Sequence, residues 1–179
     1  MLKQLAAKKT KSGSKNNFSL QEAEPPPTGD ALNGLLPYRL SLAGTLLSAR
    51  EAVMAPIRPI LRQANVTEQQ WRVLRVLGEQ NELDAATITQ MAMLLPPSVT
   101  RILRELEDRK LIARRPDEND GRRSIVSITA KGRQLMAATA QHTRAVLVEY
   151  AGVFGQERLD HLIKELAALQ SAIELFRPE

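Results

Sequence analysis

The chain of 179 residues contains no cysteine. Disulfide bonds, thiolate nucleophiles, cysteine-ligated zinc and thiol-based peroxide sensing are therefore excluded as the basis of its stability or function. Aromatic residues make up only 3% of the sequence, whereas hydrophobic residues make up 43%. Aliphatic side chains must therefore fill most of the interior, which favours helices over a β-sandwich.

Long apolar runs are also missing. No uninterrupted hydrophobic stretch approaches the length needed to cross a bilayer, and the lysine-rich N-terminus lacks the apolar segment of a secretory signal. We therefore expect a soluble cytoplasmic protein that has no membrane partner.

The excess of positive charge is confined to the N-terminus. The formal net charge of +5 arises from 25 basic and 20 acidic residues, and the first 15 residues contain five lysines and no acid. The rest of the chain is formally neutral, so any affinity for phosphate depends on where its arginines lie. Residues 1–34 show no sustained hydrophobic period and predict a disordered basic, proline-rich tail.

Residues 35–66 predict an N-terminal dimerisation helix. Apolar residues recur at helical spacing from Leu42 to Leu61. Pro56 and Pro59 each remove a backbone donor, so we expect a kink or a break near Ala55.

The next helix is predicted to begin at Thr67, because Gln70 completes a capping box with it. A short extended segment around residues 83–85 and a small helix at about residues 86–93 follow. Pro96 and Pro97 suit the first turn of another helix, where a missing N–H is tolerated. The two short helices and the tight turn between them predict a helix-turn-helix.

The helix that begins at Pro96 is predicted to be the recognition helix of this motif. Its apolar residues point inward, whereas Ser98, Arg101, Arg104 and Glu105 fall on the opposite face. Arginine and small hydroxyl side chains suit base edges and phosphates in the major groove, and Pro97 suits a thymine methyl. The candidate DNA contacts on this helix are Pro97, Ser98, Thr100, Arg101 and Arg104, with Thr100 at the edge of the exposed face.

The segments LIARR and SIVSI flank DENDG, which predicts a hairpin with the Asp120–Gly121 pair in its turn. Arg122 and Arg123 lie at the tip. They are either part of a solvated turn with self-neutralising charges, or Asp120 holds Arg122 ready for a narrow minor groove. Together with the preceding helices, the hairpin makes residues 67–130 a winged helix-turn-helix, a DNA-binding lobe that is mainly α with a small β-wing.

Residues 131–179 predict two C-terminal helices, the first capped by Thr129 and the second spanning about residues 156–176. The second carries a heptad seam. The seam comprises Leu159, Leu162, Leu166, Leu169 and Ile173, extended by Phe176. It either packs within one chain or forms a dimer interface; we favour a homodimer, which also supplies two half-sites on double-stranded operator DNA.

The wing region resembles the MarR family of bacterial repressors. Asp120-Gly121-Arg122 and Ile128-Thr129-Ala130-Lys131-Gly132 are similar to the D-x-R and L-T-x-x-G elements of that family. The resemblance spans about residues 36–176. It implies that Arg122 is the minor-groove arginine and Asp120 its partner. Pro96-Pro97 departs from the polar start of the recognition helix in many members.

Within the family, SLAGTLLSAREAVMAPIRPIL and VTEQQWRVLRVL resemble regulators of homoprotocatechuate operons and their relatives, which control the degradation of aromatic acids. This resemblance implies a homodimeric repressor that leaves its operator when a small aromatic carboxylate or phenolic compound binds. The expected function is control of an operon for aromatic-compound catabolism.

Arg50 lies on the same helical face as apolar residues, where an unpaired charge is unfavourable. It forms either a salt bridge or a clamp for an effector carboxylate. Trp71 offers a flat surface on which an aromatic effector can stack, and Met54 an adaptable wall, although a lone tryptophan is more often a core residue.

Two other functions remain open at this point. A winged helix without sequence-specific DNA binding can serve as a protein-interaction module. An enzyme is less favoured, because His142 and His161 occur singly on predicted helices, with no nucleophile pattern or phosphate-binding loop nearby. Glu149 and Glu165 suit a metal site only if the fold brings them to these histidines; we expect no metal and no cofactor.

Overall fold

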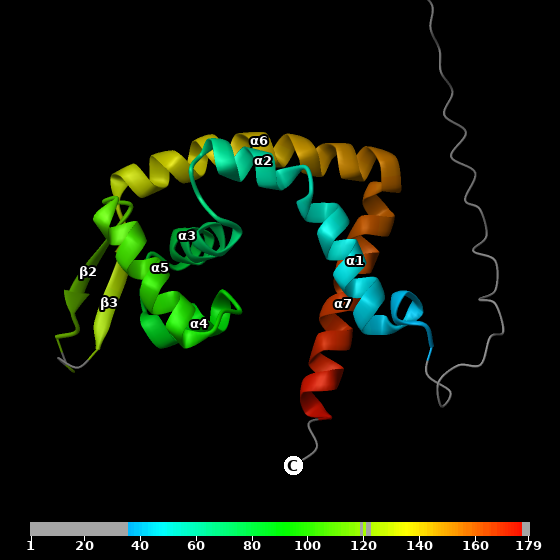
Figure 1. Ribbon diagram of the computed structural model, residues 1–179, viewed down its shortest axis with the longest axis horizontal. Helices are drawn as coiled ribbons and strands as arrows, with labels where there is room; N and C mark the ends of the chain where they lie inside the picture. Colours follow the sequence, from blue (N-terminus) through cyan, green and yellow to red (C-terminus); the bar gives the residue numbers. More distant parts are fainter. Residues whose placement is uncertain (1–35, 119, 121–122, 177–179) are drawn as a thin grey trace, which may run out of the picture.

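The computed structural model describes residues 36–118, 120 and 123–176. It is mostly helical with a small antiparallel sheet, which confirms the predicted fold class (Figure 1). In chain order the elements are η2 (Tyr38–Leu40), α1 (Leu42–Met54), α2 (Ile57–Gln63), α3 (Glu68–Gln80), β1 (Glu82–Asp84), α4 (Ala85–Met91), α5 (Pro96–Asp108), β2 (Ile112–Pro116), β3 (Ser124–Ile128), α6 (Ala130–Phe154) and α7 (Gln156–Leu175).

The break predicted near Ala55 is present between α1 and α2. Ala55 is the C-cap of α1, and Pro56 precedes the first residue of α2. Pro59 is the third residue of α2, where the backbone N–H would have no partner within the helix in any case. The two prolines therefore end one helix and are accommodated in the first turn of the next.

The capping box at the start of α3 is confirmed. The Thr67 hydroxyl accepts a hydrogen bond from Gln70 N at 3.1 Å, and Gln70 Oε1 accepts one from Thr67 N at 3.1 Å. Further along α3, Val73, Leu74 and Leu77 are fully buried. This helix therefore forms the centre of the lobe, with its start fixed by side chains.

The sheet has the strand order β1-β3-β2, with both pairs antiparallel. Val126 in the central strand lies opposite Leu83 on one side and Arg114 on the other. The predicted hairpin is therefore present, and the extended segment before α4 adds a third strand. Asp84 ends β1 and caps α4, because its Oδ1 accepts hydrogen bonds from Ala86 N and Thr87 N.

The long helix α6 begins directly against the winged lobe and runs to α7 (Figure 1). The Thr129 hydroxyl accepts a hydrogen bond from Gly132 N at 3.0 Å, as predicted for its N-cap. A Cβ at Gly132 would lie only 2.1 Å from the carbonyl oxygen of Leu111. Glycine is therefore required where α6 crosses the start of the hairpin.

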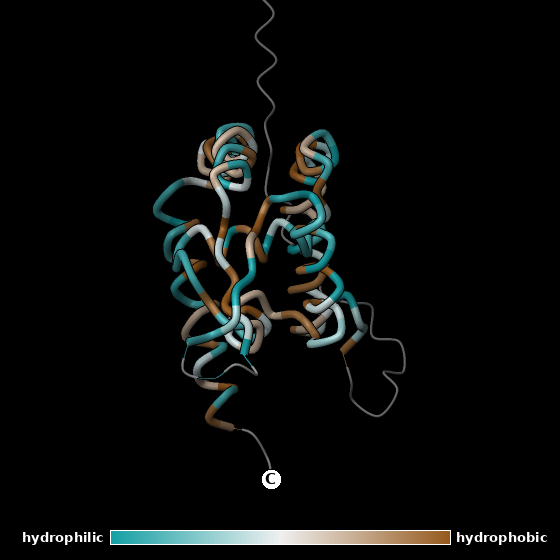
Figure 2. The backbone as a smooth tube through the Cα atoms, turned by 90° about the vertical axis from the view of Figure 1, so that its left-hand side faces the viewer, coloured by the Kyte–Doolittle hydropathy of each residue, from teal (hydrophilic) through white to brown (hydrophobic). Residues whose placement is uncertain are grey.

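The buried core belongs to the winged lobe. It comprises residues of α2 to α5, β2, β3 and the adjoining loops, and α6 packs partly buried residues against it. In α7, by contrast, none of the residues that the structure describes is buried. Hydrophobic and hydrophilic segments alternate along the helix that leads to the C-terminus (Figure 2).

Candidate functional site

The exposed face of α5 carries the residues predicted to contact DNA. Pro97, Thr100, Arg101 and Arg104 are exposed, and Ser98 is half-buried. The opposite face holds the helix in the core, since Val99, Ile102, Leu103 and Leu106 are each 1% exposed or less. The Thr100 hydroxyl donates to the Pro96 carbonyl at 3.2 Å, so it is occupied by its own helix.

Glu105 lies beside the exposed Arg101, but it does not face solvent alone, because it also contacts α3. It is half-buried, and its Oε2 accepts a hydrogen bond from Gln70 Nε2 at 2.8 Å, while its Oε1 accepts one from Arg101 Nη1 at 2.8 Å. Gln70 is itself only 7% exposed. Glu105 therefore links Arg101, on the exposed face of α5, to the start of α3.

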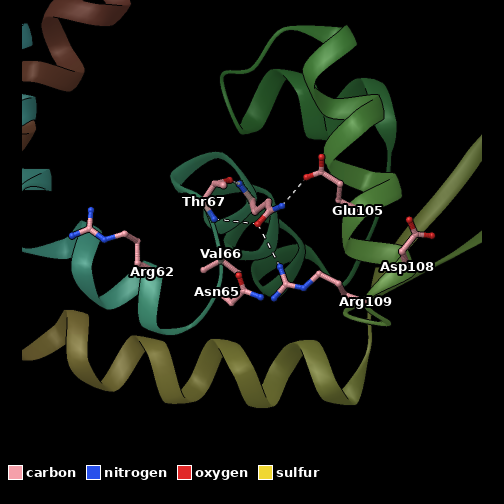
Figure 3. A pocket seen from close by; sticks show the side chains of 8 residues that line it. Arg62, Asn65, Val66, Thr67, Glu105, Asp108 and Arg109 are labelled. Atoms are coloured by element: carbon pink, nitrogen blue, oxygen red, sulfur yellow. Dashed lines mark hydrogen bonds between the residues drawn. The ribbon is translucent and has the colours of Figure 1, made fainter.

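A polar cavity of about 490 Å³ lies beside this linkage. Gln70 forms hydrogen bonds with both Thr67 and Glu105. Figure 3 shows Thr67, Glu105 and Arg109 around the cavity, with Arg109 at the end of α5. The Arg109 Nη1 lies 3.5 Å from Gln70 Oε1, a long contact. The cavity therefore has a wall of side chains that already satisfy one another.

At the wing, the structure describes Asp120 and Arg123, whereas Gly121 and Arg122 lie outside the described residues. Arg123 Nε lies 3.4 Å from Asp120 Oδ2, and Arg123 N donates to the Asp120 carbonyl at 2.8 Å. The predicted contact between Asp120 and Arg122 therefore stays a prediction.

The root of the wing is fixed by an ion pair. Arg115 Nη2 donates to Glu82 Oε2 at 2.9 Å, joining β2 to β1 across the central strand. The hydrogen bond and charge of Glu82 raise the pKa of Arg115, so its guanidinium stays charged. Arg115 is thus held by the lobe, while Arg123 lies nearer the tip with an exposed side chain.

The three residues predicted to bind an effector meet at one cavity of about 370 Å³. Arg50 and Met54 come from α1, and Trp71 comes from α3. The remaining lining residues are Val53, Ile57, Glu68, Arg72, Arg75, Thr143 and Leu147. The cavity therefore lies where the N-terminal helices, the winged lobe and α6 adjoin. Trp71 is 8% exposed, so it is a core residue that also lines the cavity.

Arg50 lies on the helical face with the apolar residues, but it is not buried. Its side chain is 49% exposed. It forms salt bridges, one of the two alternatives that the sequence left open, with Nη1 2.7 Å from Glu51 Oε1 and Nη2 2.6 Å from Glu68 Oε2. Arg58 pairs with the same two carboxylates. Partial burial raises the pKa of Glu68, but the hydrogen bonds from Arg58 and Arg50 outweigh it and lower that pKa overall.

Sequence reasoning missed Glu68, Arg72 and Arg75 as cavity residues. All three lie on α3 with Trp71, at spacings of three or four residues that place them along one side of the helix. The periodicity was available in the sequence. That these residues line a cavity could not be predicted from it, because the cavity forms only where α1 and α6 cover this side of α3.

The heptad residues of α7 divide by exposure in the single chain. Leu162, Leu166 and Ile173 are 43%, 38% and 53% exposed, while Leu159 and Leu169 are half-buried. Packing within one chain therefore leaves this seam largely uncovered. Other exposed apolar residues lie on η2, α1 and the end of α6, including Tyr38, Leu42, Leu46, Val148 and Val153.

The histidines offer no support for an enzyme. His142 and His161 are exposed on α6 and α7, as are Glu149 and Glu165. Within the described ranges, no group of three or more His, Asp or Glu side chains is arranged to hold a metal ion. No helix in the part of the chain that the structure describes is long and apolar enough to span a bilayer.

A helix-turn-helix, an arginine-bearing hairpin and flanking helices with an uncovered apolar face define a winged-helix protein of the kind that regulates transcription. Comparison with known proteins gives the family. Residues 66–124 match the MarR family, and curated relatives match over most of their own length. The chain belongs to the MarR family, as its resemblance implied.

Two relatives illustrate the similarity. The HTH-type transcriptional regulator FarR of Neisseria gonorrhoeae is 38% identical over 131 residues, which cover 72% of this chain and 90% of FarR. The homoprotocatechuate degradative operon repressor of Escherichia coli is 36% identical over 132 residues, covering 72% of this chain and 89% of the repressor. These relatives are regulators of transcription rather than enzymes, and they confirm the predicted subgroup.

Solved structures of two proteins have a similar fold. NadR in complex with 4-hydroxyphenylacetate is 37% identical, with a TM-score of 0.67 over 75% of this chain and 96% of NadR. The repressor CouR bound to a 23-mer DNA duplex is 24% identical, with a TM-score of 0.67 over 73% of this chain and 92% of CouR. At that identity, CouR supports the fold alone.

Proposed function

We propose that this chain is a homodimeric transcriptional repressor that leaves its operator when a small aromatic acid or related phenolic compound binds. The observation that carries the proposal is the cavity where Arg50, Met54 and Trp71 meet. It lies between the helices proposed to form the dimer and the lobe proposed to bind DNA. A ligand there is in a position to bias how the two are arranged.

DNA binding is assigned to α5 and the wing. The exposed guanidinium groups of Arg101 and Arg104 suit guanine edges, and Ser98, Thr100 and Pro97 complete the face presented to the major groove. We assign Arg122 to the minor groove, with Asp120 and Arg123 beside it, by resemblance to the family. Double-stranded operator DNA is therefore the partner, and the protein acts where the chromosome is, in the cytoplasm.

Dimerisation is assigned to the uncovered apolar residues of α7, with those of α1. Leu162, Leu166 and Ile173 leave apolar surface in contact with water in the single chain. Covering such surface is favourable by about 25 cal/mol for each Å² removed from water. A second copy related by two-fold symmetry covers the same residues on both chains and supplies the second DNA-binding lobe.

The chemistry of the cavity suits an aromatic anion. Its lining contains three arginines and one carboxylate, so the formal charge favours an acid. Trp71 and Met54 supply apolar surface for a ring. The relative NadR has been solved with 4-hydroxyphenylacetate, and another relative represses a homoprotocatechuate degradative operon. We therefore propose aromatic-acid catabolism as the regulated process.

The test is titration of a fluorescent duplex, carrying the region upstream of the protein's own gene, with purified protein. We expect a sequence-preferring complex whose affinity falls steeply with salt, as phosphate contacts require. Addition of 4-hydroxyphenylacetate should release the duplex, whereas 4-hydroxyphenylethanol, which lacks the acid, should do so much less effectively. Binding equal to that of a scrambled duplex would refute DNA regulation and favour a protein-interaction module. Equal release by both compounds would refute the acid.

A further inference from the structure

Arg72 connects the effector cavity to the turn in front of α5. Its side chain lines the cavity, and its Nη1 donates hydrogen bonds to the carbonyl oxygens of Ala92 at 3.0 Å and Met93 at 3.2 Å. Ala92 is the C-cap of α4, and α5 begins at Pro96. One arginine therefore both lines the proposed ligand site and holds the turn of the helix-turn-helix.

The two carbonyls lie where the backbone needs a donor. The last carbonyls of a helix have no partner within that helix, and a positive charge near them is favourable. Met93 adopts a φ of 51°, in the left-handed region, as the chain turns from α4 towards α5. Arg72 therefore holds a turn whose conformation sets the direction in which the recognition helix starts.

Arg72 differs from the other arginines of the cavity in how its charge is balanced. Arg50 pairs with two carboxylates at 2.6 and 2.7 Å, and Arg75 lies 3.5 Å from Glu79. Within the described part of the chain, Arg72 forms no ion pair, and its buried Nε has no hydrogen-bond partner. Among the described residues its guanidinium is thus stabilised by two carbonyl dipoles and not by a carboxylate, and its buried Nε–H is unused.

We propose that Arg72 receives the acid group of the effector and in doing so gives up the carbonyls of Ala92 and Met93. A carboxylate offers two oxygens to the Nε–Nη edge of a guanidinium, so it satisfies the orphaned donor and neutralises the charge together. The carbonyls provide neither. Arg72 then acts as a ligand contact and as a positioning residue for α5. This inference rests on the proposed binding of an aromatic acid in this cavity.

The release of DNA follows from competition for one side chain. DNA binds the form in which Arg72 holds the turn, and the effector binds the form in which Arg72 has turned to the ligand. Because each ligand prefers a different form, each weakens the binding of the other by the same factor. Without the Arg72 contact, an effector that still binds in the cavity should no longer weaken DNA binding by this route.

The experiment measures 4-hydroxyphenylacetate affinity by calorimetry, for the free dimer and for the dimer saturated with operator duplex. The ratio of the two dissociation constants is the coupling factor. In the wild type we expect the duplex to weaken effector binding about tenfold or more, in the usual range for coupled sites. In Arg72→Met, which keeps an unbranched side chain but no donor, we expect weaker effector binding and a coupling factor near one.

Arg75→Met is the matched control, because Arg75 lines the same cavity but is directed to Glu79 rather than to the turn. It should weaken effector binding through the lost charge and leave the coupling factor unchanged. An Arg72→Met protein that keeps the wild-type coupling factor would overturn the inference. If the wild type itself binds no 4-hydroxyphenylacetate, the proposed function fails first.

A measurement on the unaltered protein guards against a variant that does not fold. Met93 N and Leu94 N donate to the carbonyls of Gln90 and Thr89 at 3.1 Å, so both amides report on the turn. Effector binding should speed their hydrogen exchange while amides in the middle of α3 stay protected. Unchanged exchange at both positions in the saturated protein would contradict the release of the turn.

Discussion

The winged lobe and helix α7 are both rich in apolar residues, but they differ in how far those residues are buried. In the lobe, Leu74, Leu77 and Leu106 have no exposed surface. In α7, by contrast, Leu162, Leu166 and Leu175 are 43%, 38% and 90% exposed. The lobe thus completes a core from its own chain, whereas α7 carries a similar hydrophobic pattern that the described part of the chain leaves largely uncovered. Hydrophobic periodicity alone does not tell which partner buries it.

The largest loss of folding stability is expected from a change in the core of the lobe. Leu103→Ala, at a residue 1% exposed, should lower the free energy of unfolding by about 2 to 5 kcal/mol, because it removes buried methyl groups and leaves a cavity. Urea unfolding followed by circular dichroism measures this. Leu103→Met, which nearly conserves volume, is the control, and a loss as large as that of Leu103→Ala would contradict the packing argument.

A substitution in α7 should instead weaken the proposed dimer and leave the fold of the lobe intact. Leu166→Glu places a charge in the proposed seam, where Leu166 is 38% exposed in the single chain. We expect the dimer to dissociate at least about tenfold more readily, as for a hot-spot residue, while helix content is retained. Sedimentation measures the effect. Ser171→Glu adds the same charge at an exposed position off the heptad seam, and equal dissociation by both variants would argue against a specific interface.

A smaller effect tests how the lobe orients its own DNA-binding residues. Glu105→Ala leaves the buried amide of Gln70 without its acceptor and frees Arg101, so stability should fall by about 1 to 3 kcal/mol. Operator affinity should fall as well, because Arg101 is no longer held. Glu105→Gln, which retains an acceptor, should recover most of the stability. Thermal melting and duplex titration of the two variants would show whether this linkage matters.

The smallest effect concerns the ion pairs that join α1, α2 and α3. The pKa of Glu68 is lowered in the folded protein, so its contribution to stability is present above its ordinary pKa of 4.5 and is lost as the pH falls through the lower folded value. Glu68→Gln should therefore lose little stability near pH 7, since screened pairs contribute weakly, and should show a flatter loss below pH 4.5. Urea midpoints across this range test it; a wild-type slope in the variant would contradict the assignment.

Much of the fold was predictable because its signals are local. The capping box of Thr67 and Gln70, the two prolines that start α5, and the Thr129 cap each involve residues within a turn of one another. The order of helices and strands gave the winged helix, and the wing motif gave the family. The break at Ala55 followed from proline chemistry.

The site was only partly predictable, because its contacts join distant parts of the chain. Arg50, Met54 and Trp71 were expected to line one site, and they do. The ion pair of Arg50 with Glu68 and the hydrogen bond of Arg72 to the turn had no local signal. Likewise, Gln70 and Glu105 are 35 residues apart, so nothing in the spacing of either helix predicts their hydrogen bond.

The sequence by itself determined where helices begin and end and which faces are apolar, since backbone donors, prolines and side-chain periodicity act over a few residues. Only the tertiary structure decided which apolar faces are covered and which charges are paired, because burial and ion pairing depend on elements far apart in the chain. Arg72 illustrates the difference: its helix was predicted from neighbouring residues, while its place between cavity and turn exists only once α1, α4 and α6 surround α3.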